Sequence, residues 1–180
     1  MRYTVSHFKF HPLGESDLPL LRSWLLRPHV AKWWGVADSI AELRHDYLFG
    51  ANRASGTRAY VVWHANRTIG FIQSYVVMGS GGGWWESESD PGARGIDQFL
   101  GEEADLGQGI GSAMVRAYVE RLFSDPEVTV VQTDPSPENT RAIRSYEKVG
   151  FQTIGPVTTP DGAAVLMRLT REAFLVPQTR

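Results

Sequence analysis

A glycine-rich stretch is the first part of the sequence with an evident chemical use. Leu106-Gly107-Gln108-Gly109-Ile110-Gly111-Ser112 lies directly before a run of apolar residues with helical spacing. Glycines at alternate positions bring bare backbone N–H groups to the start of that helix, where the helix dipole favours phosphate. The stretch predicts a pyrophosphate cradle, and a glycine-rich turn without a ligand is the alternative. A P-loop is excluded because no Gly-Lys-Ser/Thr follows, and the acid of a dinucleotide site is missing from a strand end.

An acidic and aromatic stretch is the second candidate. Residues 86–105 hold seven carboxylates against one arginine, namely Glu86, Glu88, Asp90, Asp97, Glu102, Glu103 and Asp105 against Arg94. Four of the six tryptophans form two pairs, Trp33-Trp34 and Trp84-Trp85. Clustered carboxylates attract a cation, and tryptophan faces add cation–π contact or stack on a sugar ring. We therefore expect a site for a cationic small molecule, with Asp134 as a further acid, and a solvated acidic loop is the alternative.

A mixed α/β domain is needed to position these segments. Apolar alternation, turn residues and helix caps predict strands at residues 3–10, 59–63, 68–77, 95–100, 128–132, 151–154 and 165–169, and helices at 18–26, 39–47, 109–123 and 139–148. Leu18, Leu21, Leu25 and Leu26 give the first helix its apolar side. The order β-α-α-β-β-β-α-β-α-β-β predicts a mixed sheet, in which strands are parallel only where a helix crosses over.

Composition limits what the chain can be. Its 180 residues, 42% of them apolar, suffice for one domain over residues 1–180 with a core at about 3–170. The absence of cysteine excludes disulfides, thiolate nucleophiles and cysteine–zinc sites. A net charge of −2 disfavours a nucleic-acid partner, and scattered histidines offer no metal site. Because no apolar run has the length of a membrane helix, we expect a cytoplasmic protein without a membrane partner.

The segment Gln132–Phe151 resembles the second cofactor motif of the GCN5-related N-acetyltransferase (GNAT) family. The matching elements are Asn139 at the helix start, Ala142-Ile143, and Tyr146-Glu147-Lys148-Val149-Gly150-Phe151. The resemblance implies acetyl-CoA as donor, coenzyme A as product, and a central sheet splayed between two parallel strands. It implies that the cofactor is bound by Gln108, Gly109, Ile110, Gly111, Ser112, Asn139, Ala142, Tyr146 and Lys148. Leu106 departs from the Arg or Gln that usually begins the family's phosphate loop.

Residues 16–174 are further similar to one branch of that family, the aminoglycoside 6'-N-acetyltransferases. The stretch from Asp90-Pro91-Gly92 through Arg94-Gly95-Ile96-Asp97-Gln98 carries the resemblance most specifically. It implies that Asp97 binds or deprotonates the attacking 6'-amine and that Tyr146 protonates the leaving thiolate. It implies that the aminoglycoside is bound by Trp33, Trp34, Trp84, Trp85, Asp97, Asp134 and Leu100. Gly82 stands where close relatives carry an Asp that contacts the drug.

The expected function is therefore direct transfer of acetyl from acetyl-CoA to the 6'-amine of an aminoglycoside, which gives antibiotic resistance. The enzyme is expected to be a monomer or a homodimer. One alternative is an acetyltransferase for another amine, such as a siderophore hydroxylysine or a protein N-terminus. A second alternative is a module that binds coenzyme A or a drug without turnover. An aliphatic amine with a pKa near 10 arrives as a cation, so a nearby carboxylate must both bind it and accept its proton.

Overall fold

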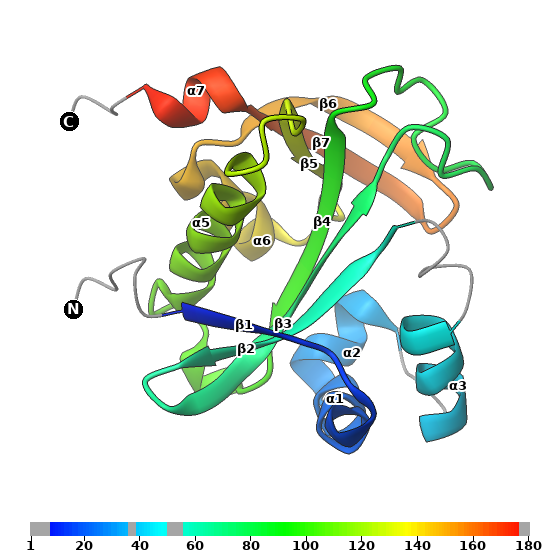
Figure 1. The fold of residues 1–180 in the computed structure, drawn as a ribbon, viewed down its shortest axis with the longest axis vertical. Helices are drawn as coiled ribbons and strands as arrows, with labels where there is room; N and C mark the ends of the chain where they lie inside the picture. The colour runs from blue at the N-terminus through cyan, green and yellow to red at the C-terminus, as the bar shows by residue number, and fades with distance from the viewer. Residues whose placement is uncertain (1–7, 36–38, 50–55, 177–180) are drawn as a thin grey trace. The chain divides into compact units, whose positions relative to one another are not determined.

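The computed structural model of the chain describes residues 8–35, 39–49 and 56–176. Two compact units divide the chain, one formed by residues 1–75 and 97–111 and the other by residues 76–96 and 112–180. In chain order the main elements are β1 (Phe8–Pro12), α1 (Leu18–Leu25), α2 (Pro28–Trp34), α3 (Ile40–Arg44), β2 (Arg58–His64), β3 (Arg67–Val76), β4 (Ala93–Leu100), α5 (Ile110–Phe123), β5 (Val130–Thr133), α6 (Thr140–Val149), β6 (Gln152–Thr159), β7 (Gly162–Thr170) and α7 (Arg171–Leu175) (Figure 1). That the whole chain is one domain stays a prediction.

The strands form a mixed sheet with the order β1-β2-β3-β4-β5-β7-β6. Strands β1, β2 and β3 pair antiparallel, as do β5, β7 and β6. The parallel ladder between β4 and β5 joins Ala93–Gly95 to Val130–Gln132, and β4 then runs on to Leu100. The predicted α/β fold is confirmed, and this short ladder is where two parallel strands were expected to separate.

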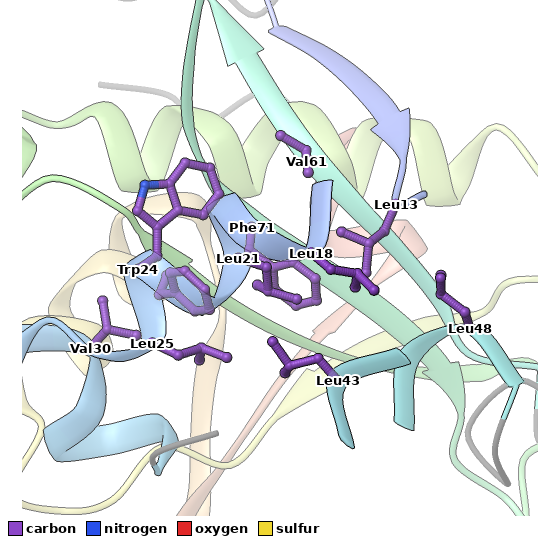
Figure 2. Packing of buried hydrophobic residues seen from close by; sticks show 11 residues of the cluster. Leu13, Leu18, Leu21, Trp24, Leu25, Val30, Leu43, Leu48, Val61 and Phe71 are labelled. Carbon is purple, nitrogen blue, oxygen red and sulfur yellow. The ribbon is translucent and has the colours of Figure 1, made fainter. Parts of the chain in front are cut away.

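In the first unit the core lies between the N-terminal helices and strands β2 to β4. The leucines of α1 recur at helical spacing, and Leu18, Leu21 and Leu25 are buried with Trp24 in one apolar cluster (Figure 2). A 3-10 turn, Glu15–Asp17, leads into α1, and in it the Gly14 N–H donates to Asp17 Oδ2 at 2.9 Å. The expectation that Leu26 shares this apolar side is wrong, because α1 ends at Leu25 and the Leu26 side chain is 48% exposed.

The helix predicted at residues 139–148 is present in the second unit as α6, shifted by one residue. Helix α6 begins after Asn139, whose Oδ1 accepts the Ala142 N–H at 3.2 Å, and ends at Gly150 in the left-handed region. Helices α2 and α7 were not predicted, and residues 3–7 of the first expected strand lie outside the described residues. No helix in the described ranges combines the length and the apolar character needed to cross a membrane.

Candidate active site

Asp97 lies on β4 beside a polar side chain of β3. Gln73 Nε2 donates a hydrogen bond to Asp97 Oδ2 at 2.9 Å. The two strands are neighbours in the sheet, and at Gly70 they approach so closely that a Cβ would collide with the Phe99 carbonyl oxygen. Asp97 is half-buried, so its carboxylate is oriented by the amide and still has access to solvent. A carboxylate in this position can bind an ammonium group and accept its proton.

An aromatic cluster lies close to Asp97 in the first unit, since one of its members, Phe99, follows Asp97 by two residues on β4. The Trp34 ring meets Phe99 and Phe71 edge to face, with centroids 4.9 and 5.5 Å apart. Tyr47 also packs edge to face on Phe71, at 5.5 Å, and its Oη accepts the Trp34 indole N–H at 3.0 Å. These contacts fix Trp34 and Tyr47 in one orientation relative to each other.

The hydroxyl of Tyr47 remains protonated far above neutral pH. Burial raises the pKa of Tyr47 to about 12, and the negative charges of Asp97 and Asp46 act in the same direction, while the hydrogen bond from Trp34 acts against them. The charge of Asp97 therefore reaches this hydroxyl. At neutral pH the Tyr47 hydroxyl thus stays neutral while it accepts the Trp34 N–H.

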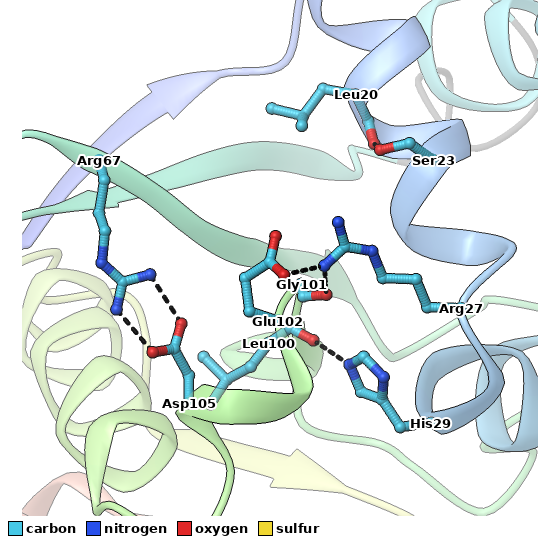
Figure 3. A network of polar contacts seen from close by, with 9 residues as sticks. All are labelled: Leu20, Ser23, Arg27, His29, Arg67, Leu100, Gly101, Glu102 and Asp105. Carbon is cyan, nitrogen blue, oxygen red and sulfur yellow. Dashed lines mark hydrogen bonds and ion pairs between the residues drawn. The ribbon is translucent and has the colours of Figure 1, made fainter.

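The two tryptophans of the first pair have different surroundings, although the sequence suggested one role for both. Trp34 belongs to the aromatic cluster, whereas Trp33 is 39% exposed and has Lys32 Nζ 4.4 Å from its ring centroid. Leu100, which was expected to contact the ligand, is buried. Its side chain is only 6% exposed, and its carbonyl oxygen lies 3.1 Å from His29 Nε2 (Figure 3). An influence of Leu100 on a ligand would act through the packing at the end of β4.

The acidic stretch of residues 86–105 is not one continuous acidic surface. Three of its carboxylates form ion pairs with arginines from elsewhere in the sequence: Glu88 with Arg168, Glu102 with Arg27, and Asp105 with Arg67. Asp90 is used locally, because Thr129 Oγ1 and the Gly92 N–H donate to it and thereby lower its pKa. The prediction that these carboxylates form one cation-attracting patch is therefore wrong for the three that are paired with arginine. Asp97 differs from those three because the amide of Gln73 donates a hydrogen bond to it.

The second tryptophan pair belongs to a loop of the second unit that is fastened to the β6–β7 hairpin. Glu88 Oε2 pairs with Arg168 Nη2 of β7 at 3.0 Å. A Cβ at Gly83 would lie 3.3 Å from Pro160 at the tip of the hairpin. Trp84 and Trp85 are both half-buried, and Trp85 has a φ of 54°, which is unusual for a bulky residue. Asp134, directly after β5, is half-buried in the same unit.

The glycine loop opens α5 as predicted. Gly107 and Gly109 have φ values of 75° and 82°, which other residues rarely adopt, and no atom lies within 4 Å of where a Cβ would stand on either. The backbone is therefore open at the N-terminus of a helix of 14 residues, as an anion cradle requires. Gln108 is exposed, and its amide donates to the Ala104 carbonyl. Ile110 is buried, and Gly111 and Ser112 are half-buried in the first turn.

The cofactor residues predicted on and before α6 lie at its two ends, with Asn139 and Ala142 at the start and Tyr146 and Lys148 near the end. The Tyr146 ring is buried at 4% exposure against Phe151, with ring centroids 5.3 Å apart, and Lys148 is exposed. Asn139 and Ala142 are joined by the cap of the helix, so the asparagine has a structural task whatever else it does. Tyr146 is held by packing, which gives its hydroxyl a defined direction.

Two residues of the candidate site were missed in the sequence. Gln73 carried a signal, because an amide within the largely apolar strand of residues 68–77 needs a polar partner. Tyr47 carried none, since an aromatic residue near the end of a short helix is ordinary in a core. Its partner Trp34 is 13 residues away, and only the folded chain brings them together.

The chain matches the acetyltransferase (GNAT) domain family over residues 14–159. It is 52% identical over 165 residues to aminoglycoside N(6')-acetyltransferase type 1 of Klebsiella pneumoniae, which covers 90% of this chain and 82% of the relative. A kanamycin resistance protein of Rhizobium radiobacter is 64% identical over 93 residues, covering 52% of this chain and 86% of the relative. The crystal structure of aminoglycoside acetyltransferase AAC(6')-Ib with coenzyme A and kanamycin is similar with a TM-score of 0.90 at 48% identity, covering 96% of this chain and 99% of that chain.

Proposed function

The chain belongs to the GNAT acetyltransferases, and from this premise we propose that it is an aminoglycoside 6'-N-acetyltransferase. In the cytoplasm it transfers the acetyl group of acetyl-CoA directly to the 6'-amine of an aminoglycoside. The modification makes the cell resistant to that antibiotic. The observation that carries the proposal is the likeness, along nearly the whole chain, to enzymes named for this activity. A likeness of fold alone would not specify the acceptor.

Asp97 is the acceptor-side group of this proposal. Its carboxylate, held by the Gln73 amide, binds the 6'-ammonium group and takes one proton from it, which leaves a neutral amine that can attack the thioester carbon. Trp34 and Tyr47 supply a rigid wall with a neutral hydroxyl, against which a sugar ring packs. Trp33, Trp84, Trp85, Asp134 and Leu100 complete the proposed set for the drug, with Leu100 acting through packing.

The donor side fits acetyl-CoA. The open backbone at Gly107 and Gly109 before α5 suits the negatively charged diphosphate, and exposed Lys148 adds a positive charge. When bound, acetyl-CoA supplies an activated thioester. The proposed binding residues are Gln108, Gly109, Ile110, Gly111, Ser112, Asn139, Ala142, Tyr146 and Lys148. Once the carbon–nitrogen bond has formed, Tyr146 donates its phenolic proton to the sulfur as the carbon–sulfur bond breaks. The second proton of the acylated nitrogen then restores the phenol, and Asp97 releases its proton to solvent.

A thiol-release assay with acetyl-CoA and kanamycin tests the proposal directly. We expect coenzyme A and acetylated kanamycin in equal amounts, together with a higher inhibitory concentration of kanamycin for a sensitive host that expresses the chain. An acetyltransferase for a hydroxylysine or a protein N-terminus would release thiol only with those amines and would leave the host sensitive. A module that only binds coenzyme A would release no thiol with any amine.

A further inference from the structure

The connection between β4 and α5, residues 101–109, carries a set of polar contacts that the proposed reaction does not use. Residues 103–105 form a short 3-10 turn, and the glycine loop follows it immediately. Three side chains from two earlier parts of the first unit reach this connection and the residue before it (Figure 3). The connection is thus attached at both ends, which is unusual for a surface loop.

The strongest attachment lies next to the glycine loop. Arg67 Nη1 donates to Asp105 Oδ2 at 2.8 Å, and Nη2 donates to Oδ1 at 2.6 Å, which makes a two-bond fork (Figure 3). The Asp105 side chain is only 9% exposed, whereas that of Arg67 is 46% exposed. Arg67 begins β3, so the fork ties the connection to the sheet.

The opposite end of the connection is attached to the corner between α1 and α2. Arg27 Nη1 donates to the Gly101 carbonyl at 2.7 Å and forms an ion pair with Glu102, while His29 hydrogen-bonds the Leu100 carbonyl. A Cβ at Gly101 would collide with the Trp24 ring, so the backbone lies directly on the core. This end is fixed by packing, and the Arg67–Asp105 pair attaches the connection to β3 beside the glycine loop.

We propose that Arg67 and Asp105 are positioning residues for acetyl-CoA binding, because they hold the glycine loop in the form that receives the diphosphate. This inference rests on the proposed function. Asp105 stands two residues before Gly107, the first residue of the loop with a left-handed backbone. A loop already ordered before binding loses less conformational entropy when the anion binds. Because Arg67 is about half exposed, it can be hydrated when its partner is removed, so folding loses little.

Asp105→Asn is the first test variant, since it keeps the shape of the side chain and removes its charge. Glu103→Gln is the matched control, because Glu103 lies in the same turn, is exposed, and forms no ion pair within the described part of the chain. Calorimetry with coenzyme A measures binding without turnover, and steady-state kinetics give KM for acetyl-CoA and for kanamycin separately. We expect Asp105→Asn to raise the Kd for coenzyme A and the KM for acetyl-CoA about tenfold. We expect the KM for kanamycin and the kcat to change less than about twofold.

Two further variants separate positioning from general stability. Arg67→Lys keeps the charge but loses the fork, and we expect an intermediate rise in the Kd for coenzyme A. The exchange Arg67→Asp with Asp105→Arg restores an ion pair and should recover part of the affinity lost in Asp105→Asn. Recovery of affinity by the exchange supports positioning, and thermal melting identifies any variant that fails to fold.

The inference is overturned if folded Asp105→Asn binds coenzyme A as tightly as wild type, or if Glu103→Gln weakens binding equally. It is also overturned if the KM values for acetyl-CoA and kanamycin rise together. Failure of the proposed function looks different, because the wild-type chain itself would then show neither coenzyme A binding nor acetyl transfer.

Discussion

Asp97 and Tyr146, the two groups proposed to move protons, are held in contrasting ways. Asp97 is half-buried, and a glutamine amide from a neighbouring strand fixes its carboxylate. Tyr146 is almost fully buried on α6, where Phe151, a residue just past the end of the same helix, packs against its ring. One group depends on a polar contact between distant parts of the sequence, and the other on local apolar packing.

This difference indicates how each group would respond to change. A polar contact on a half-buried carboxylate can be altered by one substitution without much loss of stability, because water replaces the lost bond. Packing around a buried ring tolerates removal of the hydroxyl but not of the ring itself. We therefore expect hydroxyl removal at Tyr146 and charge removal at Asp97 to leave the fold intact and to change activity by different amounts.

Asp97→Asn should have the largest effect of the substitutions considered. The amide cannot take the proton of the attacking amine, so we expect kcat/KM for kanamycin to fall about a hundredfold or more. Glu138→Gln, at an exposed acid just before α6, is the control for loss of one negative charge. Steady-state thiol release measures both, and activity of Asp97→Asn close to wild type would remove Asp97 from the mechanism.

Tyr146→Phe should have a smaller effect, because water can partly replace a donor to the leaving sulfur. We expect kcat to fall about ten- to thirtyfold, with melting temperature nearly unchanged. Tyr60→Phe is the matched control, since it removes a hydroxyl from another buried tyrosine on β2. If the two variants lose the same activity, the hydroxyl of Tyr146 has no special part in the reaction.

Gln73→Leu tests whether Asp97 depends on its partner. Loss of the amide donor frees the carboxylate to rotate, and we expect kcat/KM to fall about fivefold. In the double variant with Asp97→Asn the loss should not be additive, because the amide acts through the carboxylate. Full additivity in that cycle would show that Gln73 acts independently.

Tyr47→Phe should change activity least at neutral pH. Its clearest effect should be on the pH dependence of the free energy of unfolding above about pH 10. The folded chain keeps the Tyr47 proton to a pKa of about 12, whereas an unfolded tyrosine loses it near 10. The contribution of Tyr47 to the free energy of unfolding, which arises from this difference in pKa, is fully present below pH 10 and is lost as the pH rises towards 12. Urea unfolding at pH 9 and pH 11 should therefore show wild type losing more stability than Tyr47→Phe. Equal losses would contradict the raised pKa.

The parts of the molecule that the sequence predicted well are those determined by short-range patterns. The Asn139 cap, the Gly150 stop and the apolar positions between them specify α6 within one residue. The glycine loop before α5 is likewise local, because glycine is the residue type that readily adopts the φ values near 80° found at Gly107 and Gly109. Helix α2 was not predicted, although it begins at Pro28 and proline is favoured in the first turn of a helix.

The surroundings of the site residues could not be predicted, because they depend on partners far away in the sequence. Glu88 meets an arginine 80 residues later, and Asp105 meets one 38 residues earlier. A count of charges along residues 86–105 therefore suggests a larger acidic patch than the folded chain has. In the same way, Trp33 and Trp34 are adjacent and identical, and only the tertiary packing of Trp34 distinguishes them.

Acetyl transfer to neomycin and to paromomycin tests the central claim most directly, because the two drugs differ only in the 6'-amine of the first and the 6'-hydroxyl of the second. Thiol release and the mass of the product should be followed at equal drug concentration. We predict one acetyl group on neomycin, located at the 6'-nitrogen, and no turnover of paromomycin. Equal acetylation of both drugs, or acetyl at another amine of neomycin, would contradict the assignment of the 6'-amine as acceptor.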